Sequence, residues 1–474
     1  MKQQRHLFKV LALIMFGLFL LLAVYGGYSI STYGNRWFSF SRNPRVRAQK
    51  QTVTAGDIVD RNGVILATTV DGKRVYQEDE ASRRAVVHLL GDSQGQVSNG
   101  VETFQTRYLY GFETPLSERF NALLSGQPKQ GDSVTLTVDS RLCTEITRSF
   151  ARHNPGKNGA AVVMNYKTGE LIAQISLPNF DPMNITAATH ADAGRPFWNR
   201  ATQSVYPPGS SFKIITTTSA LENLPGITEQ EIPCTGGLPA MNQAIRDYGN
   251  AVHKQLTLRE AFKKSCNNVY ALLALTLEDE KLRKTAESFG FNDNFLFRDL
   301  VVENSTYPTE NRNQFELATT GIGQSALAAT PMHMCMVAAA IANDGVMMEP
   351  RLLMSVETAA GSVRPLYQPK VYRTALSAEH AAILQSYMRD VVKSGTGTRA
   401  AVPGLTVCGK TGSAESSLAG SDVTYGWFVG HIENDDLPYA VSILVESIED
   451  GEGGGSTAAP VAADVFEYLQ GLRP

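Results

Sequence analysis

Cysteine is scarce in this sequence, and the few copies show no regular arrangement. The chain of 474 residues contains five cysteines, an odd number, at Cys143, Cys234, Cys266, Cys335 and Cys408. Disulfide frameworks have characteristic cysteine spacings, and none is present here. We therefore expect small buried side chains and no structural disulfide, although the spacing does not exclude one pair.

The sequence also lacks a strong net charge and a histidine pattern typical of a metal site. The formal net charge is −3, with 43 basic against 46 acidic residues, which gives no argument for nucleic acid binding. The histidines are scattered without metal-ligand spacing, and we interpret each of these as an ordinary surface or core residue: His88, His153, His190, His253, His333, His380 and His431.

An uncharged apolar segment is present at the N-terminus, at Val10–Ile30. Roughly 20 such residues span a bilayer as a helix. Basic residues precede the segment, and the positive-inside rule then keeps that end in the cytoplasm. A cleaved signal peptide is the alternative, but its apolar region is shorter, about 7–15 residues, and ends in a small-x-small site. We predict a cytoplasmic tail (1–9), a transmembrane anchor (10–30) and an extracytoplasmic remainder.

Two parts follow the predicted anchor. Residues 31–131 are polar and mixed, and Gly56–Ala67 predicts two short strands around an Asn62-Gly63 turn. No cluster of acids or bases occurs there, so we interpret this part as a small β-rich pedestal, with a protein-docking module as an equal alternative. A second domain is predicted for residues 132–474.

The second domain has strands at both ends and helices between them. Gly159–Tyr166 and Glu170–Ser176 predict a hairpin, because both runs are apolar and turn residues join them. Further strands are predicted at 133–138, 405–411, 424–432 and 439–445, and helices at 142–153, 214–224, 258–277, 332–343 and 458–472. This order implies one sheet closed by both ends of the domain and flanked by a helical region. The glycine-rich segment 449–456 predicts a flexible loop.

Ser210 and Lys213 form the only Ser-x-x-Lys pair in the chain. A serine hydroxyl is a poor nucleophile at neutral pH and needs a nearby base. Positions i and i+3 of a helix share one face, so a helix that begins at Ser210 brings Lys213 to its hydroxyl. Lys213 can act as a base only if its pKa falls, which burial and a neighbouring cation such as Lys410 would cause. A helix-capping serine is the alternative interpretation.

A second candidate string is Ser265-Cys266-Asn267, which precedes a helix or lies inside one. Its hydroxyl could relay a proton between Lys213 and a leaving group, and the Asn267 amide could hold a peptide carbonyl. Ser-x-Asn also occurs at Ser41-Arg42-Asn43. That copy lies beside the membrane and before Ser210, so we discard it.

The third candidate is Lys410-Thr411-Gly412, one of three Lys-Ser/Thr-Gly strings. Lys167-Thr168-Gly169 lies in a predicted turn, and Lys393-Ser394-Gly395 ends a predicted helix. Only the third string ends a β-branched run, and a sheet edge there can pair with substrate backbone while the lysine and hydroxyl hold a carboxylate. The segment from Gly404 to Thr411 also matches the pattern of a nucleotide-binding phosphate loop. The four residues between its two glycines are mostly apolar and favour a strand, so we do not expect a nucleotide site.

In this order, the three strings resemble the acyl-serine site of penicillin-binding proteins and serine β-lactamases. Tyr206–Lys213 is similar to the transpeptidase domain of class B penicillin-binding proteins, and the likeness covers nearly the whole chain. Other segments match landmarks of that family: 178–182, 321–324, 330–331, 341–345 and 427–430. The resemblance implies an α+β transpeptidase domain, an antiparallel sheet flanked by helices with a helical subdomain, after a pedestal and one transmembrane helix.

The resemblance also implies the role of each site residue. Ser210, Lys213 and Ser265 would be catalytic, and Asn267, Lys410, Thr411, Gly412 and Ser413 would bind substrate. Ser413 stands where the family has threonine and keeps the hydroxyl; its N–H and that of Ser210 would form the oxyanion hole. Ser210 would be acylated by the D-Ala-D-Ala end of a peptidoglycan stem peptide, and an amine of a neighbouring strand would take the acyl group.

The implied partners are peptidoglycan stem peptides, β-lactam antibiotics that acylate the same serine, and a SEDS-family glycan polymerase in the membrane. No cofactor and no metal are implied. The alternatives are a D,D-carboxypeptidase, which differs only in its acceptor, and a non-catalytic β-lactam sensor or envelope scaffold. A serine β-lactamase is disfavoured because the Glu-x-x-Leu-Asn string of one common class is missing from the sequence.

Overall fold

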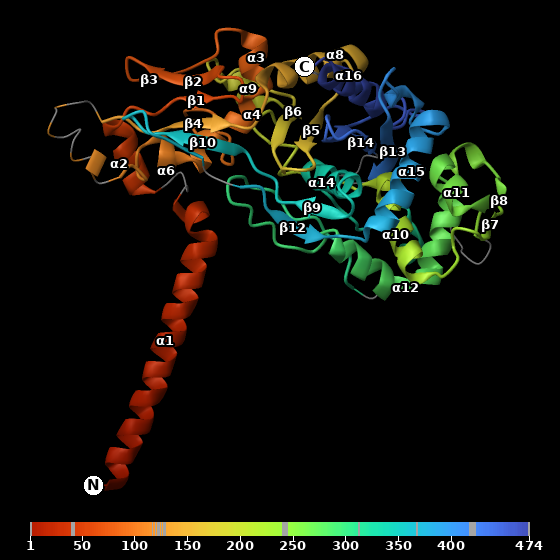
Figure 1. Ribbon diagram of the computed structural model, residues 1–474, viewed down its shortest axis with the longest axis horizontal. Helices are drawn as coiled ribbons and strands as arrows, with labels where there is room; N and C mark the ends of the chain where they lie inside the picture. The colour runs from red at the N-terminus through yellow and green to blue at the C-terminus, as the bar shows by residue number, and fades with distance from the viewer. Residues whose placement is uncertain are drawn as a thin grey trace.

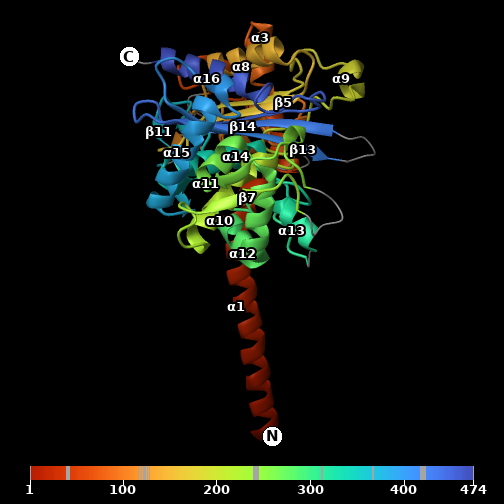
Figure 2. The same cartoon turned by 90° about the vertical axis from the view of Figure 1, so that its right-hand side faces the viewer.

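A long apolar helix projects from a folded body in the computed structural model (Figures 1 and 2). Helix α1 spans Lys2–Phe38, and its Gln4–Ile30 stretch, with a mean hydropathy of 2.7, is long and apolar enough to cross a membrane. This helix contains the anchor predicted for residues 10–30. The structure describes residues 2–38, 43–115, 117–118, 120, 124, 126, 129–238, 245–310, 313–365, 368–416 and 423–472.

A six-stranded sheet lies in the part of the body nearest to α1 (Figure 1). Its strand order is β11-β10-β4-β1-β2-β3. Strands β1 and β2 pair antiparallel on either side of the predicted Asn62-Gly63 turn, where Gly63 has a φ of 79°. The strands are β1 (Ile58–Val59), β2 (Ile65–Val70), β3 (Lys73–Tyr76), β4 (Ser133–Leu136), β10 (Leu353–Glu357) and β11 (Val363–Pro365).

This sheet crosses the domain boundary predicted at residue 132. Strand β4 pairs with β1 on one side and with β10 on the other, so later parts of the chain complete a sheet begun by the pedestal. The division into residues 31–131 and 132–474 therefore stays a prediction. The helices of this N-terminal part are α2 (Pro44–Thr52), α3 (Glu80–Ala85), α4 (Val87–Leu90), α5 (Val101–Phe104) and α6 (Thr106–Leu109).

A five-stranded antiparallel sheet forms the centre of the second domain. Its order is β13-β14-β15-β5-β6, so the last strands of the chain pair with the first strands of the domain. The prediction of one sheet closed by both ends is thereby confirmed, as is the β5–β6 hairpin. The strands are β5 (Gly159–Asn165), β6 (Leu171–Leu177), β13 (Val407–Ser416), β14 (Val423–Ile432) and β15 (Tyr439–Val445).

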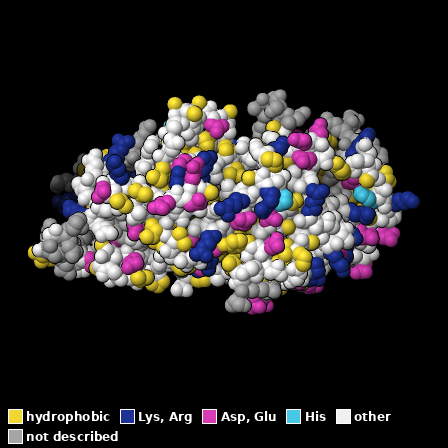
Figure 3. All heavy atoms as spheres, turned by 90° about the horizontal axis from the view of Figure 1, so that it is seen from above, with side chains coloured by type: hydrophobic (Ala, Val, Ile, Leu, Met, Phe, Trp, Pro, Cys, Tyr) yellow, Lys and Arg dark blue, Asp and Glu magenta, His cyan; other side chains and the backbone are white. Residues whose placement is uncertain are grey.

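Helices cover both faces of this sheet (Figure 2). Helices α8 (Ser140–His153) and α16 (Ala458–Gly471) pack on one face, and α14 (Pro331–Ala342) packs on the other. Every residue of α14 up to Ile341 is buried, since nearly all of its side chains are apolar. On the outer face, α8 and α16 are joined by Arg152 and Asp464, and acidic and basic side chains are interspersed there (Figure 3).

A helical region lies between β6 and β13 and faces the open edge of β13. Its helices are η1 (Gly209–Phe212), α10 (Lys213–Asn223), η2 (Tyr248–Asn250), α11 (Leu258–Lys264), α12 (Asn267–Ser288), α13 (Gln314–Gly321), α15 (Ala378–Ser394) and η3 (Thr398–Ala400). Two small hairpin-like pairs complete it, β7 (Glu231–Cys234) with β8 (Lys254–Thr257) and β9 (Val346–Met348) with β12 (Val371–Thr374). Helix α9 (Ala187–Ala191), from the same stretch of the chain, lies near α3 and α4 instead (Figure 1).

All five cysteines belong to the described part of the chain. Each is buried, and none forms a disulfide. The expectation of small buried cysteine side chains is therefore confirmed.

Candidate active site

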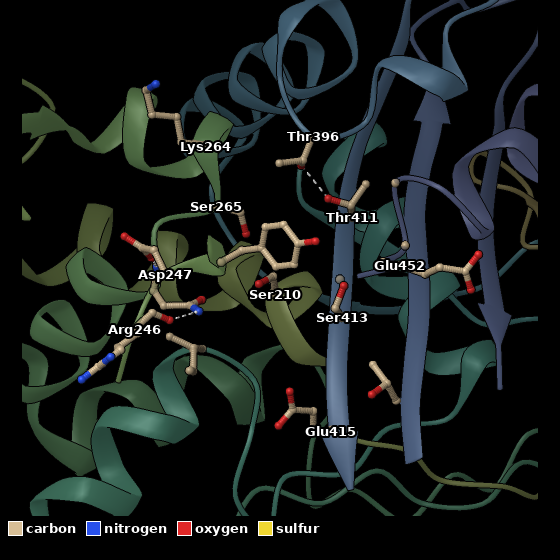
Figure 4. A pocket seen from close by; sticks show the side chains of 18 of the residues that line it. Ser210, Arg246, Asp247, Lys264, Ser265, Thr396, Thr411, Ser413, Glu415 and Glu452 are labelled. Atoms are coloured by element: carbon tan, nitrogen blue, oxygen red, sulfur yellow. Dashed lines mark hydrogen bonds between the residues drawn. The ribbon is translucent and has the colours of Figure 1, made fainter. Parts of the chain in front are cut away.

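A cavity of about 930 Å³ lies where the helical region meets the open edge of β13 (Figure 4). All three candidate strings reach it, and each comes from a different element. The predicted site residues in its wall are Ser210, Ser265, Asn267, Thr411, Gly412 and Ser413. Lys213 and Lys410 lie fully buried behind this wall. The fold therefore brings together every site residue that the sequence predicted.

Ser210 lies in the short helix η1, immediately before α10, and is partly exposed to the cavity. The turn in front of it is packed tightly against β13. Gly209 has a φ of 52°, and a Cβ there would lie 2.4 Å from the Ser413 carbonyl oxygen, so glycine is required. The turn is also fixed by two hydrogen bonds, from Gly209 N–H to the Gly323 carbonyl at 2.9 Å and from Trp427 Nε1 to the Pro207 carbonyl at 3.0 Å.

Ser265 lies at a break between two helices. The prediction of one helix over residues 258–277 was wrong, because α11 ends at Lys264 and α12 begins at Asn267. Ser265 adopts a left-handed conformation with a φ of 59°, and the Cys266 side chain caps α12. The break turns the Ser265 hydroxyl towards the cavity, opposite Ser210 and Ser413 (Figure 4). A continuous helix could not present both Ser265 and Asn267 there.

Lys213 donates three hydrogen bonds to the second string. Its Nζ lies 2.7 Å from the Ser265 carbonyl oxygen, 3.2 Å from Ser265 Oγ and 2.7 Å from Asn267 Oδ1. Within the described residues, none of these bonds reaches Ser210, although the i+3 spacing predicted that contact. Burial lowers the pKa of Lys213 to about 7, so a neutral amine is accessible near neutral pH.

Lys410 approaches the same hydroxyl from the sheet. Its Nζ donates to Ser265 Oγ at 2.9 Å and to the Thr411 carbonyl at 2.8 Å. Burial, and then the charge of Lys213, lower the pKa of Lys410 well below its usual range. Ser265 Oγ thus accepts hydrogen bonds from two buried amines whose pKa values are both lowered, so it can pass a proton between them.

Alternate residues of β13 line the cavity along the open edge of this strand. The Gln324 amide, oriented to satisfy both of its atoms, donates to the Glu415 carbonyl at 3.1 Å and accepts from Glu415 N–H at 3.2 Å. Backbone N–H and C=O groups of successive residues point to opposite sides of a strand. Thr411 and Ser413 therefore direct their backbone groups to the same open edge as Glu415. The Ser413 N–H is therefore free of the pairing with β14. Thr411 Oγ1 is held by Thr396 Oγ1 at 2.6 Å.

The other copies of the short strings lie elsewhere. Lys167-Thr168-Gly169 forms the β5–β6 turn, and Lys393-Ser394-Gly395 forms the end of α15. Strand β13 continues to Ser416, so no helix follows Lys410-Thr411 and the phosphate-loop pattern is excluded. Part of the Ser41-Arg42-Asn43 copy lies outside the described residues.

Two groups at the site were missed from the sequence. Asp247 accepts a hydrogen bond from the Asn267 N–H, while Asn267 Nδ2 donates to the Arg246 carbonyl at 2.9 Å. The second group is Thr396, which holds the Thr411 hydroxyl. Neither Asp247 nor Thr396 belongs to a motif, so no local signal in the sequence identified them. The segment 449–456 also lines the cavity.

Glycines let the segment 449–456 approach the third string closely. A Cβ at Gly454 would lie 2.5 Å from the Gly412 carbonyl oxygen, and one at Gly453 would lie 2.8 Å from Ser413 Oγ. Composition predicted a flexible loop there, whereas these contacts give the glycines a packing role as well.

Comparison with known proteins identifies the family of this chain. Residues 159–467 match the family described as the penicillin binding protein transpeptidase domain. The chain belongs to the class B penicillin-binding proteins. The resemblance drawn from the three strings and the α+β fold expected from it are confirmed.

Mycobacterial and related proteins are among the similar ones. This penicillin-binding protein is 31% identical over 473 residues to the peptidoglycan D,D-transpeptidase PbpA of Mycobacterium tuberculosis, covering 91% of this chain and 92% of that protein. The imipenem acyl-enzyme complex of M. tuberculosis penicillin-binding protein A superposes with a TM-score of 0.80 at 28% identity, over 89% of this chain and 100% of that one. A D,D-transpeptidase domain from Eggerthella lenta superposes with a TM-score of 0.73 at 32% identity. The match covers 89% of this chain and 100% of that one.

Proposed function

We propose that this class B penicillin-binding protein is a peptidoglycan D,D-transpeptidase that cross-links stem peptides through an acyl-enzyme on Ser210. One observation carries the proposal: Ser265 Oγ lies within hydrogen-bond distance of both Lys213 and Lys410, beside Ser210 in one cavity. Relatives of this chain are named peptidoglycan D,D-transpeptidases, and related structures hold β-lactams as acyl-enzymes. Both facts support the same chemistry here.

Acylation begins with proton transfer from Ser210 to a neutral amine. Lys213 accepts the hydroxyl proton, which its lowered pKa allows, and one of its three present hydrogen bonds is given up. Ser210 Oγ then bonds to the carbonyl carbon of the penultimate D-Ala. The negative charge on the carbonyl oxygen is stabilised by the N–H groups of Ser210 and Ser413.

Collapse of the tetrahedral intermediate breaks the peptide bond. The leaving D-Ala nitrogen receives a proton from Ser265, which is replaced from Lys213 or Lys410. Before this step, the terminal carboxylate is held by Thr411 and Ser413 with the charge of Lys410 behind them, and Asn267 holds a peptide carbonyl of the substrate. The acyl-enzyme that remains is an ester of Ser210.

Transfer repeats these steps in reverse order. An amine of a neighbouring stem peptide attacks the ester carbonyl, loses a proton through the same relay, and forms the cross-link as Ser210 regains its proton. β-Lactams enter the same route, but their ring-opened leaving group stays attached and the ester persists.

A direct test supplies a stem peptide that ends in D-Ala-D-Ala to the full chain, with and without a second peptide bearing a free amine. Mass spectrometry of the products should show a cross-linked peptide and free D-Ala, both lost in Ser210→Ala. Hydrolysed stem peptide without cross-links, at saturating acceptor, would assign a carboxypeptidase instead. No turnover of either kind would reject both enzymes.

We also propose that α1 anchors the protein in the cell membrane with its N-terminus cytoplasmic and the catalytic body outside. The basic residues that precede the apolar stretch support this orientation. A SEDS-family glycan polymerase would contact α1 and the pedestal. Co-purification of such a polymerase with the full chain, and its loss when α1 is replaced by an unrelated transmembrane helix, tests that partnership.

A further inference from the structure

Glu415 places an exposed carboxylate in the wall of the active-site cavity. It follows Ser413 by two residues on β13, so both side chains lie on the same face of the strand. Both residues line the cavity, and Figure 4 shows Glu415 on the side of β13 where Ser210 lies. Within the described part of the chain, this carboxylate has no hydrogen bond or ion pair. The bond-making steps at Ser210 do not use it.

Opposite charges lie at the two ends of the β13 edge that lines the cavity. Arg399 lines the cavity at the Thr411 end, since Thr396, three residues before it, contacts Thr411 Oγ1. Its guanidinium is permanently charged, and Lys410 adds a buried amine behind Thr411. Glu415 lies at the other end, about 13 Å from Thr411 at 3.2–3.4 Å per residue. A ligand along this edge therefore meets positive charge first and negative charge last.

The substrate pose that acylation requires determines which part of a stem peptide reaches Glu415. The terminal carboxylate lies at Thr411 and Ser413, and the carbonyl oxygen of the penultimate D-Ala lies at the Ser413 N–H. The peptide therefore runs along β13 from its C-terminus at Thr411 towards Glu415. Extended chains advance about 3.3 Å per residue, so the residue that precedes D-Ala-D-Ala lies close to Glu415, which is roughly 6–7 Å beyond Ser413.

Gln324 closes the open edge of β13 at Glu415. Its side-chain amide pairs with the backbone N–H and carbonyl of Glu415, at 3.2 and 3.1 Å. The backbone groups of Glu415 are thus already occupied, and a substrate strand can pair with β13 only as far as Ser413. Recognition of the residue before D-Ala-D-Ala then depends on side chains, and Glu415 offers a negative charge.

The chemistry of cross-linking supplies a matching positive group. The acceptor stem peptide offers a free amine, and donor and acceptor are the same kind of molecule, so the donor carries that amine too. We propose that Glu415 binds the side-chain ammonium group of the residue that precedes D-Ala-D-Ala in the donor. This assignment rests on the proposed transpeptidase function. A carboxylate and an ammonium group at about 2.7–2.9 Å form a charge-assisted hydrogen bond, which also orients the donor along β13.

The ion pair also gives the donor and acceptor amines different reactivity. A nearby carboxylate favours the charged form of an amine. The donor amine held by Glu415 therefore stays protonated and cannot attack the ester on Ser210, whereas the acceptor amine enters without such a partner. Glu415 is thus a specificity-determining residue that acts on the donor before any bond is made.

Two penicillins that differ by one amine test the assignment without a cross-linking assay. Their rings acylate Ser210, and their acylamino side chains take the place of the residue before D-Ala-D-Ala. One probe carries an Nα-acetyl-L-lysyl group, and the other carries Nα-acetyl-L-norleucyl, which lacks the amine. The full chain in detergent should react about tenfold faster with the lysyl probe, a preference between that of an exposed ion pair and that of a hydrogen bond to a charged group.

Variants assign the preference to Glu415. Glu415→Gln should react with the two probes at similar rates, and Glu415→Lys should prefer the norleucyl probe because its charge is reversed. Glu357→Gln changes an exposed acid on β10, outside the cavity wall, and should keep the preference. A wild-type rate of Glu415→Gln with the norleucyl probe shows that the fold and the acylation machinery are intact.

Two kinds of failure can be told apart. Equal rates of the wild-type chain with both probes, or a preference that survives in Glu415→Gln, would overturn the role of Glu415 alone. Absence of labelling by either probe would reject the acyl-enzyme on which the assignment rests.

Stem peptides extend the test to the natural reaction. For a donor with lysine before D-Ala-D-Ala, kcat/KM for D-Ala release should fall about tenfold in Glu415→Gln, and for a norleucine donor it should not change. An effect of Glu415→Gln confined to the acceptor peptide would assign the acceptor amine to Glu415 and overturn the proposal.

Discussion

Lys410 Nζ donates a hydrogen bond of 2.9 Å to Ser265 Oγ, although the two residues lie 145 positions apart in the chain. This bond joins the sheet edge to the turn between α11 and α12. The bond makes the second and third strings parts of one hydrogen-bonded unit. Lys213, from the first string, donates to the same Ser265 hydroxyl. The catalytic properties that we predict depend on this junction.

The rate of acylation should rise with pH through the pKa of Lys213. Burial lowers that pKa to about 7, and the neutral amine is the base, so the active fraction increases as pH rises. From about pH 6 to about pH 8 the second-order rate constant for a penicillin should increase ~tenfold and then level off. Stopped-flow labelling across this range measures it. A rate that is flat or falls with rising pH would exclude Lys213 as the base.

Lys410→Ala should slow acylation, while Lys393→Ala should not. Lys410 donates to Ser265 and supplies charge behind the carboxylate site, and hydrogen bonds to charged groups contribute about 1.5–3 kcal/mol. We expect a decrease of about 10–150-fold in the acylation rate constant. Lys393 belongs to the same type of tripeptide but lies at the end of α15, so it is the matched control. Equal effects of both variants would mean that the third string is misassigned.

Ser265→Ala should remove the proton relay and leave the fold intact. The variant keeps the carbonyl of residue 265 that Lys213 contacts, but loses the hydroxyl between the two lysines. General acid–base groups contribute about 10²–10⁴-fold, so acylation should fall within that range. Thermal unfolding provides the folding control. Full activity in Ser265→Ala would show that protons reach the leaving group by another route.

Gly323→Ala should disrupt the turn that carries Ser210. A Cβ at residue 323 would lie 1.8 Å from the Gly209 carbonyl oxygen, at a φ of 83°. Gly361 has almost the same φ of 82°, but its Cβ would meet nothing within 4 Å. Both variants carry about 1–3 kcal/mol of backbone strain.

Only Gly323→Ala adds a clash with the turn, so it should unfold at a lower temperature than Gly361→Ala and react slowly with penicillin. Differential scanning calorimetry and gel labelling compare the two. Equal melting temperatures and equal labelling would mean that the contact between residues 209 and 323 does not position Ser210.

Local signals in the sequence were sufficient for the elements that carry Ser210 and Lys410. The β-branched run before Lys410 predicted a strand, and the turn residues at Lys167 predicted a hairpin; both elements are present. Ser210 was expected at the start of a helix and lies in η1 just before α10. These signals work because turn chemistry and apolar periodicity act over a few residues.

Contacts between distant segments had no such signal. Apolar periodicity continues past Ser265, so it hid the break that a left-handed residue and a cysteine cap produce there. The pairing of Val356 with Val134 joins the first strand of the second domain to a strand far along the chain. Asp247 and Cys234 meet Cys266 only through the path of the β7–β8 hairpin. Spacing along the chain does not predict such contacts, because they arise from tertiary packing alone.

The most direct test is covalent labelling of Ser210. Membranes that contain the full chain are incubated with a fluorescent penicillin, and the protein is separated on a denaturing gel and digested for mass spectrometry. We predict a stable fluorescent band whose adduct lies on Ser210, and no band for Ser210→Ala. An unlabelled wild-type chain, an adduct on another residue, or a band that persists in Ser210→Ala would contradict the acyl-serine mechanism.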